Sequence, residues 1–427
     1  MWINRDKKAK TVEKRTDMEN KKLTKLEKYW IMYDVGNSAF VMLIATIIPI
    51  YFNYLAKSAG ISEVNYLAYW GYAASVSTVI VALIGPALGS IADMQNYKKP
   101  LFTISMMVGV IGCAAMSFPT SWVVFLAVFV IAKVGYNASL IFYDSMLVDI
   151  TSTDRMDEVS SQGYAWGYIG SCIPFILSLV LVLMYEKIGI TMHMAMTGAF
   201  FLNAVWWAVV TIPLLRNYRQ KNYVAVPSHS VKNSFKRLGQ TFMDVHKEKK
   251  IFWYLLAFFF FIDGVYTIIE MATAYGSALG LDSTGLLLAL LVTQIVAFPC
   301  ALICAKLSGK YPTERLIGVC IVAYIGIALF AIQLDKQWEF WTLAVLVGMF
   351  QGAIQALARS YFAKIIPAEK SGEYFGIYDI CGKGASFMGT TLVGIVAQVT
   401  GVANAGVAVI AVLFVIGYIL FKKAVRA

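Results

Sequence analysis

Residues 89–99 read GSIADMQNYKK, a stretch that ends a long apolar run with an aspartate and then two lysines. About 216 residues later, residues 305–315 read AKLSGKYPTER and end another long apolar run in a similar way. After the first stretch comes Glu158, which recurs after the second as Glu373 at an offset of 215, each three residues after a basic residue. A repeat of this length in a membrane protein is typical of transporters built from two similar halves in parallel orientation.

The composition places the chain in a membrane. Of its 427 residues, 59% are hydrophobic and 14% are charged, and the mean hydropathy is +0.67. Soluble domains have about a quarter of their residues charged. The composition therefore excludes a soluble enzyme, and at roughly 20 residues per spanning helix the length holds about a dozen spans.

Reading the apolar runs predicts an all-α membrane protein of twelve transmembrane helices in two pseudo-symmetric six-helix halves. The predicted organisation is a cytoplasmic tail over 1–28, a first half over 29–215, a basic cytoplasmic linker over 216–250 and a second half over 251–427. The predicted spans lie near 30–56, 66–92, 101–118, 121–147, 163–185, 194–215, 251–278, 284–305, 315–333, 338–358, 374–398 and 402–421.

The basic residues predict the orientation. Of 36 Lys and Arg residues, 31 fall in the tail, the linker and the other segments on one side, whereas the loops on the other side hold only Lys57, Lys187 and Lys336. Positive charge accumulates on the cytoplasmic side, so both termini are expected there. The net charge of +11 then reflects topology and attraction to anionic lipid rather than a nucleic-acid partner.

Seven ionisable residues fall inside or at the edge of predicted spans: Asp34, Lys133, Asp144, Asp263, Glu270, Asp379 and Lys383. A charge near the bilayer centre costs about 3 kcal/mol or more, so each is a functional candidate. The third, sixth, ninth and twelfth spans carry no such residue in their apolar stretches, and they are expected at the periphery of the bundle, facing lipid. The charged spans are expected to enclose a polar centre.

Substrate binding is assigned to six polar residues. Lys133 and Lys383 are predicted to anchor a carboxylate or similar anion, because a lysine at this depth needs an acid from another helix or an anionic ligand. The remaining polar contacts are expected from Asp34, Asn37, Asn137 and Gln355. Two alternatives stay open: Asp34 could cap a helix or pair with a loop lysine, and Lys383 could pair with Asp379 at i, i+4.

Proton coupling is assigned to Asp263 and Glu270, which share one face of the seventh span and have no basic neighbour in sequence. Gating is assigned to residues at the cytoplasmic ends of the spans. Asp93 is suited to bond the N-terminus of the eleventh span and hold the cytoplasmic side shut. The predicted gating set is Asp93, Lys98, Lys99, Arg155, Arg359 and Asp379.

No catalytic motif occurs in the sequence, which predicts no enzyme, no cofactor and no nucleotide-driven step. The six cysteines all lie in apolar segments, where packing is the expected role, and no metal site is predicted.

The stretch 89–99 resembles the loop signature after the second helix of the major facilitator superfamily, with Asn96 in place of the usual glycine. Further stretches at 33–40, 262–267 and 351–383 resemble the branch related to fungal vacuolar amino-acid effluxers and their bacterial relatives. The resemblance spans nearly the whole chain. It implies a twelve-helix transporter and, for the fungal members, an amino-acid substrate.

The sequence thus predicts a secondary transporter that moves a small polar or zwitterionic solute, an amino acid or small organic anion, by alternating access with proton coupling. It is expected as a monomer in a bacterial plasma membrane, in contact with membrane lipids, with a vacuolar membrane as the alternative. The competing functions are a flippase or exporter of lipid-like or drug-like amphiphiles and a non-transporting membrane sensor or scaffold.

Overall fold

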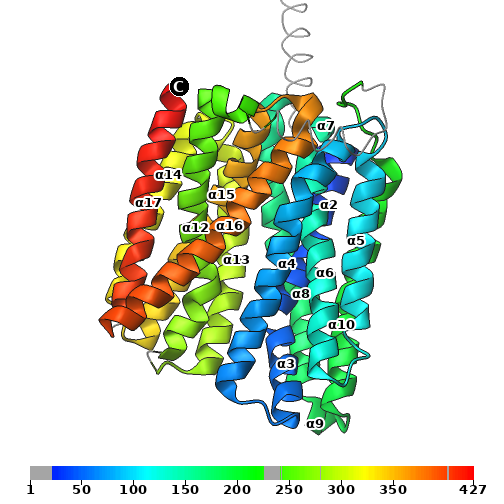
Figure 1. The fold of residues 1–427 in the computed structure, drawn as a ribbon, viewed down its shortest axis with the longest axis vertical. Coiled ribbons are helices and arrows are strands. Elements are labelled where there is room, and N and C mark those ends of the chain that lie inside the picture. The colour runs from blue at the N-terminus through cyan, green and yellow to red at the C-terminus, as the bar shows by residue number, and fades with distance from the viewer. Residues whose placement is uncertain (1–21, 226–240, 242, 279, 402) are drawn as a thin grey trace, which may run out of the picture.

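The computed structural model describes residues 22–225, 241, 243–278, 280–401 and 403–427. Within these residues, twelve helical spans are long and apolar enough to cross a membrane, as the sequence predicts. The predicted tail lies outside the described residues as far as residue 21, and the predicted linker does so over 226–240 and at 242. Figure 1 shows the helices of the first half packed side by side, next to those of the second half.

The first half is formed by the helices that precede the linker. They are α2 (Lys25–Ala45), α3 (Ile47–Ser58), α4 (Glu63–Ala92), α5 (Lys98–Ala115), α6 (Trp122–Ser145), α7 (Leu147–Ile150), α8 (Met156–Leu183), α9 (Tyr185–Ile188) and α10 (Met192–Asn217). The first span consists of α2 and α3, which are interrupted at Thr46. Pro49 lies three residues further on and has no N–H to donate to the preceding turn, which explains the break.

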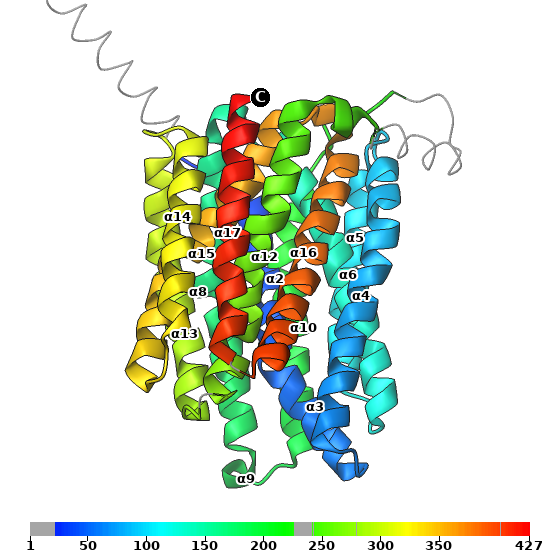
Figure 2. The same cartoon turned by 60° about the vertical axis from the view of Figure 1, so that its left-hand side comes forward.

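The second half follows the linker. Its helices are α12 (Lys249–Ala278), α13 (Ser283–Leu307), α14 (Thr313–Ile332), α15 (Gln337–Ile365), α16 (Ser371–Thr400) and α17 (Ala403–Arg426). Figure 2 shows α17 beside α12 and α14 on one side of this half. The spans that carry charge only at their ends, α5, α10, α14 and α17, each present large exposed apolar side chains, as expected for helices that face lipid.

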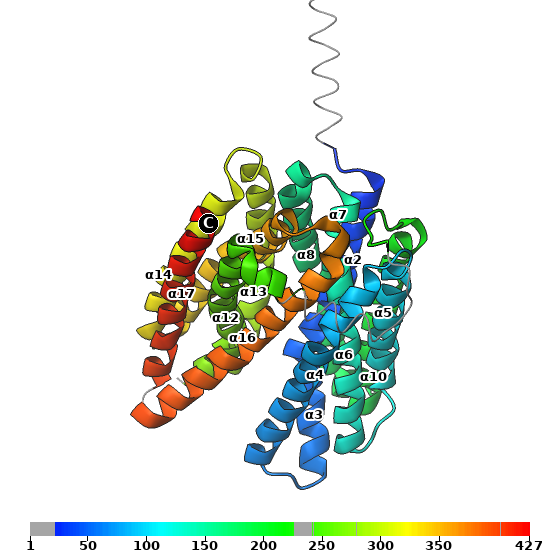
Figure 3. The same cartoon turned by 45° about the horizontal axis from the view of Figure 1, so that its top comes forward.

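The two halves meet through two main crossings, α4 with α16 and α8 with α13 and α15. At the first crossing the backbones touch, because a Cβ atom on Gly89 would lie 2.1 Å from the carbonyl oxygen of Gly372. Figures 1 and 3 show that the halves approach each other at the end of the bundle that carries α7 and diverge towards α3 and α9. We refer to the end with α7, where α2 begins and α17 ends, as the termini face.

The turn after α4 requires an unusual backbone conformation. Asn96 has φ of 66° and is the one non-glycine residue with positive φ in the described part of the chain. Asparagine tolerates the left-handed region better than most residues. It can therefore replace the glycine that the family signature has at this position.

Candidate functional site: charged clusters between the halves

A buried arginine from the second half enters the first half. The Arg359 guanidinium on α15 donates to Asp34 on α2 at 3.2 Å and to Asp144 on α6 at 3.0 Å. It also donates to the hydroxyl and carbonyl oxygens of Ser160 on α8 at 2.9 and 3.1 Å, and its charge lies 4.6 Å from the ring centre of Trp30. We call these residues the arginine cluster. All three nitrogen atoms of the guanidinium therefore donate hydrogen bonds to groups from the opposite half.

A second cluster closes the crossing of α4 and α16. Both carboxylate oxygens of Asp93, at the end of α4, accept the backbone N–H groups of Gly372 and Glu373 at 2.7 and 2.9 Å. The aspartate therefore bonds the first turn of α16, where helical N–H groups lack partners within the helix. This is the contact that the sequence predicts for Asp93.

Lys98 lies beside this aspartate and is fully buried. Its ammonium group donates to the hydroxyl of Ser371 on α16 at 2.8 Å and lies 3.8 Å from both Asp93 and Asp149. Burial raises the pKa of Asp93 to about 7, while Lys98 and the two N–H groups act in the opposite direction.

A third cluster joins α8 to α14 and α15. Asp157, at the start of α8, accepts hydrogen bonds from Lys364 at 2.6 Å, Ser360 at 2.6 Å and Thr313 at 2.5 Å. We call it the Asp157 cluster. All three clusters join the two halves near the termini face, so the structure is closed at that face.

Two predicted gating residues take no part in these clusters. Arg155 pairs with Glu27 and Glu158, both in its own half. For the side chain of Lys99, the described residues show no hydrogen bond or ion pair. A gating role for Arg155 and Lys99 stays a prediction that these contacts do not support.

Five predicted site residues lie together deeper between the halves. The Lys383 ammonium group on α16 pairs with Asp379 and lies 3.5 Å from the carbonyl oxygen of Asn137 on α6. Lys133, one turn before Asn137, interacts electrostatically with Glu270 on α12 and with Lys383. The side chains of Lys383 and Asp379 are 18% and 14% exposed, so water reaches both. We call these residues the central cluster, and Asp379 lies here rather than with the closing contacts.

The other predicted residues are distributed around this cluster. Asp34 lies in the arginine cluster, with Asn37 at 3.5 Å, so its partner is Arg359 and not a loop lysine. Gln355 on α15 lies 3.5 Å from the hydroxyl of Tyr168 on α8. The structure therefore groups Lys133, Asn137 and Lys383 together and places Asp34 and Asn37 with the closing contacts.

Asp263 is fully buried on α12. One carboxylate oxygen accepts the N–H of Gly389 at 3.0 Å and the hydroxyl of Thr267 at 3.2 Å, while the other has no hydrogen-bond partner among the described residues. A Cβ atom at position 389 would lie 2.2 Å from Asp263, so only glycine allows this contact with α16. No described lysine or arginine forms an ion pair with this carboxyl.

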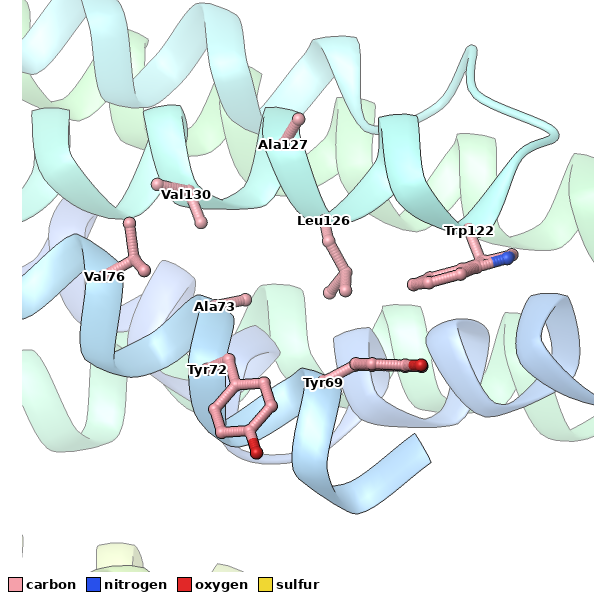
Figure 4. A pocket seen from close by; sticks show the side chains of 8 residues that line it. All are labelled: Tyr69, Tyr72, Ala73, Val76, Trp122, Leu126, Ala127 and Val130. Carbon is pink, nitrogen blue, oxygen red and sulfur yellow. The ribbon is translucent and has the colours of Figure 1, made fainter. Parts of the chain in front are cut away.

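A pocket away from these clusters is apolar. It lies between α4 and α6 and is lined by residues such as Tyr69, Ala73 and Trp122 (Figure 4). It contains none of the predicted site residues. Within the described residues, no group of His, Cys, Asp or Glu side chains could hold a metal ion.

Several cluster residues were missed by the sequence analysis, namely Asp149, Asp157, Thr313, Ser360 and Lys364. A signal was available for Asp157. At the repeat offset of 215 it corresponds to Gly372, just as Gly309 corresponds to Asp93 at an offset of 216. At the second crossing the acid therefore lies at the start of α8, as Asp157, instead of at the end of α13.

Two six-helix halves that pack around intramembrane charges are the architecture of the major facilitator superfamily, and solved structures of that class share the fold. FucP in the outward conformation matches with a TM-score of 0.69 at 11% identity, covering 94% of this chain and 97% of FucP. The human organic anion transporter MFSD10 matches with a TM-score of 0.61 at 14% identity, covering 93% of this chain and 99% of MFSD10. The chain therefore has the fold of these multi-pass membrane transporters.

The chain belongs to the family described as vacuole effluxer Atg22 like, whose model matches residues 24–154 and 148–426. It is 41% identical over 405 residues to the MFS-type transporter YxiO of Bacillus subtilis (strain 168), covering 94% of this chain and 95% of YxiO. It is 21% identical over 413 residues to autophagy-related protein 22 of Coccidioides immitis (strain RS), covering 78% of this chain and 68% of that protein. The family resemblance predicted from sequence is confirmed.

Proposed function

We propose that this transporter moves a small polar solute that carries a carboxylate, an amino acid or small organic anion, through alternating access driven by protons. The observation that supports the substrate class is the central cluster. It brings Lys133 and Lys383 from opposite halves close enough for their charges to interact, each next to an acid, Glu270 for Lys133 and Asp379 for Lys383. A substrate carboxylate can take the place of either acid as the partner of a lysine in this setting.

The amphiphile alternative has less support. The apolar pocket between α4 and α6 would suit a hydrocarbon chain, but it lies apart from every charged cluster between the halves. An amphiphile without an anionic group would gain nothing from Lys133 and Lys383. A scaffold would have no use for them either.

In this proposal the three clusters at the termini face form the cytoplasmic gate, and the structure is its closed, outward-facing form. The protein is located in the plasma membrane, with its termini in the cytoplasm. Separating α4 from α16 and α8 from α15 would open the central cluster to the cytoplasm while the opposite ends close.

Replacing Lys133 with glutamine is expected to weaken substrate binding at least tenfold, because the ligand carboxylate loses a charged partner in a site of low dielectric. The measurement is a thermal-shift screen of the purified protein against amino acids and dicarboxylates, since a ligand that binds only the folded state raises the melting temperature.

The matched control is Lys187→Gln, which removes an exposed lysine at the opposite end of the bundle. It should respond to ligand as the unmodified protein does. Equal ligand response in Lys133→Gln and in the control would sink the assignment of Lys133 as an anchor.

Replacing Asp263 with asparagine is expected to abolish accumulation driven by a pH gradient while leaving exchange of substrate across the membrane intact. The buried carboxyl has no cationic partner among the described residues, so a proton is the counter-charge that it can bind and release. Asparagine keeps the acceptor for Gly389 but carries no proton that it can release.

The two activities are measured in proteoliposomes, with Asp335→Asn as the control because Asp335 is an exposed acid remote from the clusters. Gradient-driven accumulation that survives in Asp263→Asn would show that Asp263 does not carry the coupling proton.

A further inference from the structure

A basic groove lies at the termini face on the outer side of the second half. It has a volume of about 520 Å³ and is lined by His246, Lys249, Phe252 and Trp253 next to the start of α12, and by Lys423, Arg426 and Ala427 at the end of α17. These two helices make extensive contacts with each other, so the walls of the groove belong to one rigid unit.

The cations of the groove have no carboxylate partner among the described residues. Within the described part of the chain, none of Lys249, Lys423 and Arg426 forms an ion pair, and all three are exposed. Lys423 instead lies 3.5 Å above the ring centre of Trp253, a cation–π contact that fixes its ammonium group at the groove wall. Three uncompensated positive charges around one hollow favour an anion with several oxygen acceptors.

The groove lies at the boundary of the hydrophobic span. The candidate spans Lys249–Ala272 and Asn404–Arg426 begin and end at it. A tryptophan beside basic residues is typical of the level of the lipid headgroups. The hollow is thus at the height where a phospholipid phosphate lies.

An apolar track leads from the groove along α17. Val412, Val415 and Ile419 are 56%, 42% and 62% exposed, and with Arg426 they follow helical spacing along one face. An acyl chain could lie along this face while its headgroup occupies the hollow. A free phosphate ion would make no use of the track.

We propose that the groove binds the phosphate of an anionic phospholipid, with Lys249, Lys423 and Arg426 as its ligands and Trp253 holding Lys423 in place. The occupant is a membrane lipid and not the transported solute, because the groove lies outside the interface between the halves. The site is therefore independent of the proposed function.

The test is native mass spectrometry of the full chain released from detergent micelles and titrated with dioleoyl-phosphatidylglycerol. The triple variant K249Q/K423Q/R426Q is expected to bind this lipid at least tenfold more weakly than the unmodified protein. Dioleoyl-phosphatidylcholine and inorganic phosphate serve as further probes, and both are expected to bind weakly to all forms of the protein.

The matched control is K306Q/K310Q/R315Q, which removes two lysines and an arginine that are exposed at the same face between α13 and α14. This variant should keep its affinity for phosphatidylglycerol within about twofold. If the triple groove variant does not fold, Lys423→Gln alone is used, and a loss of at least threefold is expected.

Three results would overturn the proposal. If the groove variant binds phosphatidylglycerol as tightly as the unmodified protein, the groove is not the binding site for this lipid. Equal losses in the groove variant and the control would show diffuse attraction to the basic face. Inorganic phosphate that binds tightly and displaces the lipid would identify a site for a free anion.

Discussion

Replacing Arg359 with glutamine is expected to abolish transport and to lower the free energy of unfolding by about 3–5 kcal/mol, the usual cost of removing one partner of a buried ion pair. The arginine is 2% exposed and forms ion pairs with two carboxylates, Asp34 and Asp144, from the opposite half. Without it, both acids are left in a buried setting with no cation. Stability is measured by thermal unfolding of the purified protein and transport by uptake into proteoliposomes.

A double variant separates this ion-pair effect from a general packing defect. Adding Asp34→Asn to Arg359→Gln removes one of the stranded acids, so part of the lost stability should return. The matched control is Arg315→Gln, since Arg315 is exposed at the same face. If Arg359→Gln is as stable as this control, the arginine cluster does not hold the halves together.

Replacing Gly89 with alanine is expected to reduce transport more than tenfold by preventing closure at the termini face. The added Cβ atom would lie 2.1 Å from the carbonyl oxygen of Gly372, a distance that requires the two backbones to separate. Because the halves move as units, the other crossing should open as well.

Cys304 can report this opening. It is buried on α13 beside the hydroxyl of Ser161 on α8, at the second crossing. In a protein that keeps Cys304 alone, Gly89→Ala should make this thiol react with a water-soluble maleimide several times faster. Gly71→Ala, in the same helix with no atom within 4 Å of the added methyl group, is the control and should react slowly. Slow reaction in both variants would contradict closure through the glycine contact.

The helices and their division into halves were predictable from sequence because a membrane span must bury its backbone polar groups within a long apolar helix. The Asp93 contact was predictable for a similar reason. An acid at the end of one span can bond the free N–H groups of a helix that starts at the same face. This pairing can be predicted without knowing the detailed fold.

The partners of Arg359 were not predictable in the same way. Asp34, Asp144 and Arg359 are separated by 110 and by more than 200 residues, and spacing within a helix gives no information about which helices of opposite halves meet. The sequence did offer the pair of Asp379 and Lys383 as an alternative to a substrate contact, because i, i+4 spacing brings such residues together within one helix. The structure contains this pair.

A small solute with a carboxylate is proposed to bind between Lys133 and Lys383. The most direct test is solute counterflow in proteoliposomes, which needs no ion gradient. Vesicles are preloaded with an unlabelled mixture of alanine, leucine, glutamate, lysine and succinate, and each labelled compound is added outside in turn. At least one label should accumulate transiently with the unmodified protein and fail to do so with Lys383→Gln. Absence of counterflow for the whole panel, together with movement of a labelled phospholipid between leaflets, would contradict the account and favour transport of amphiphiles.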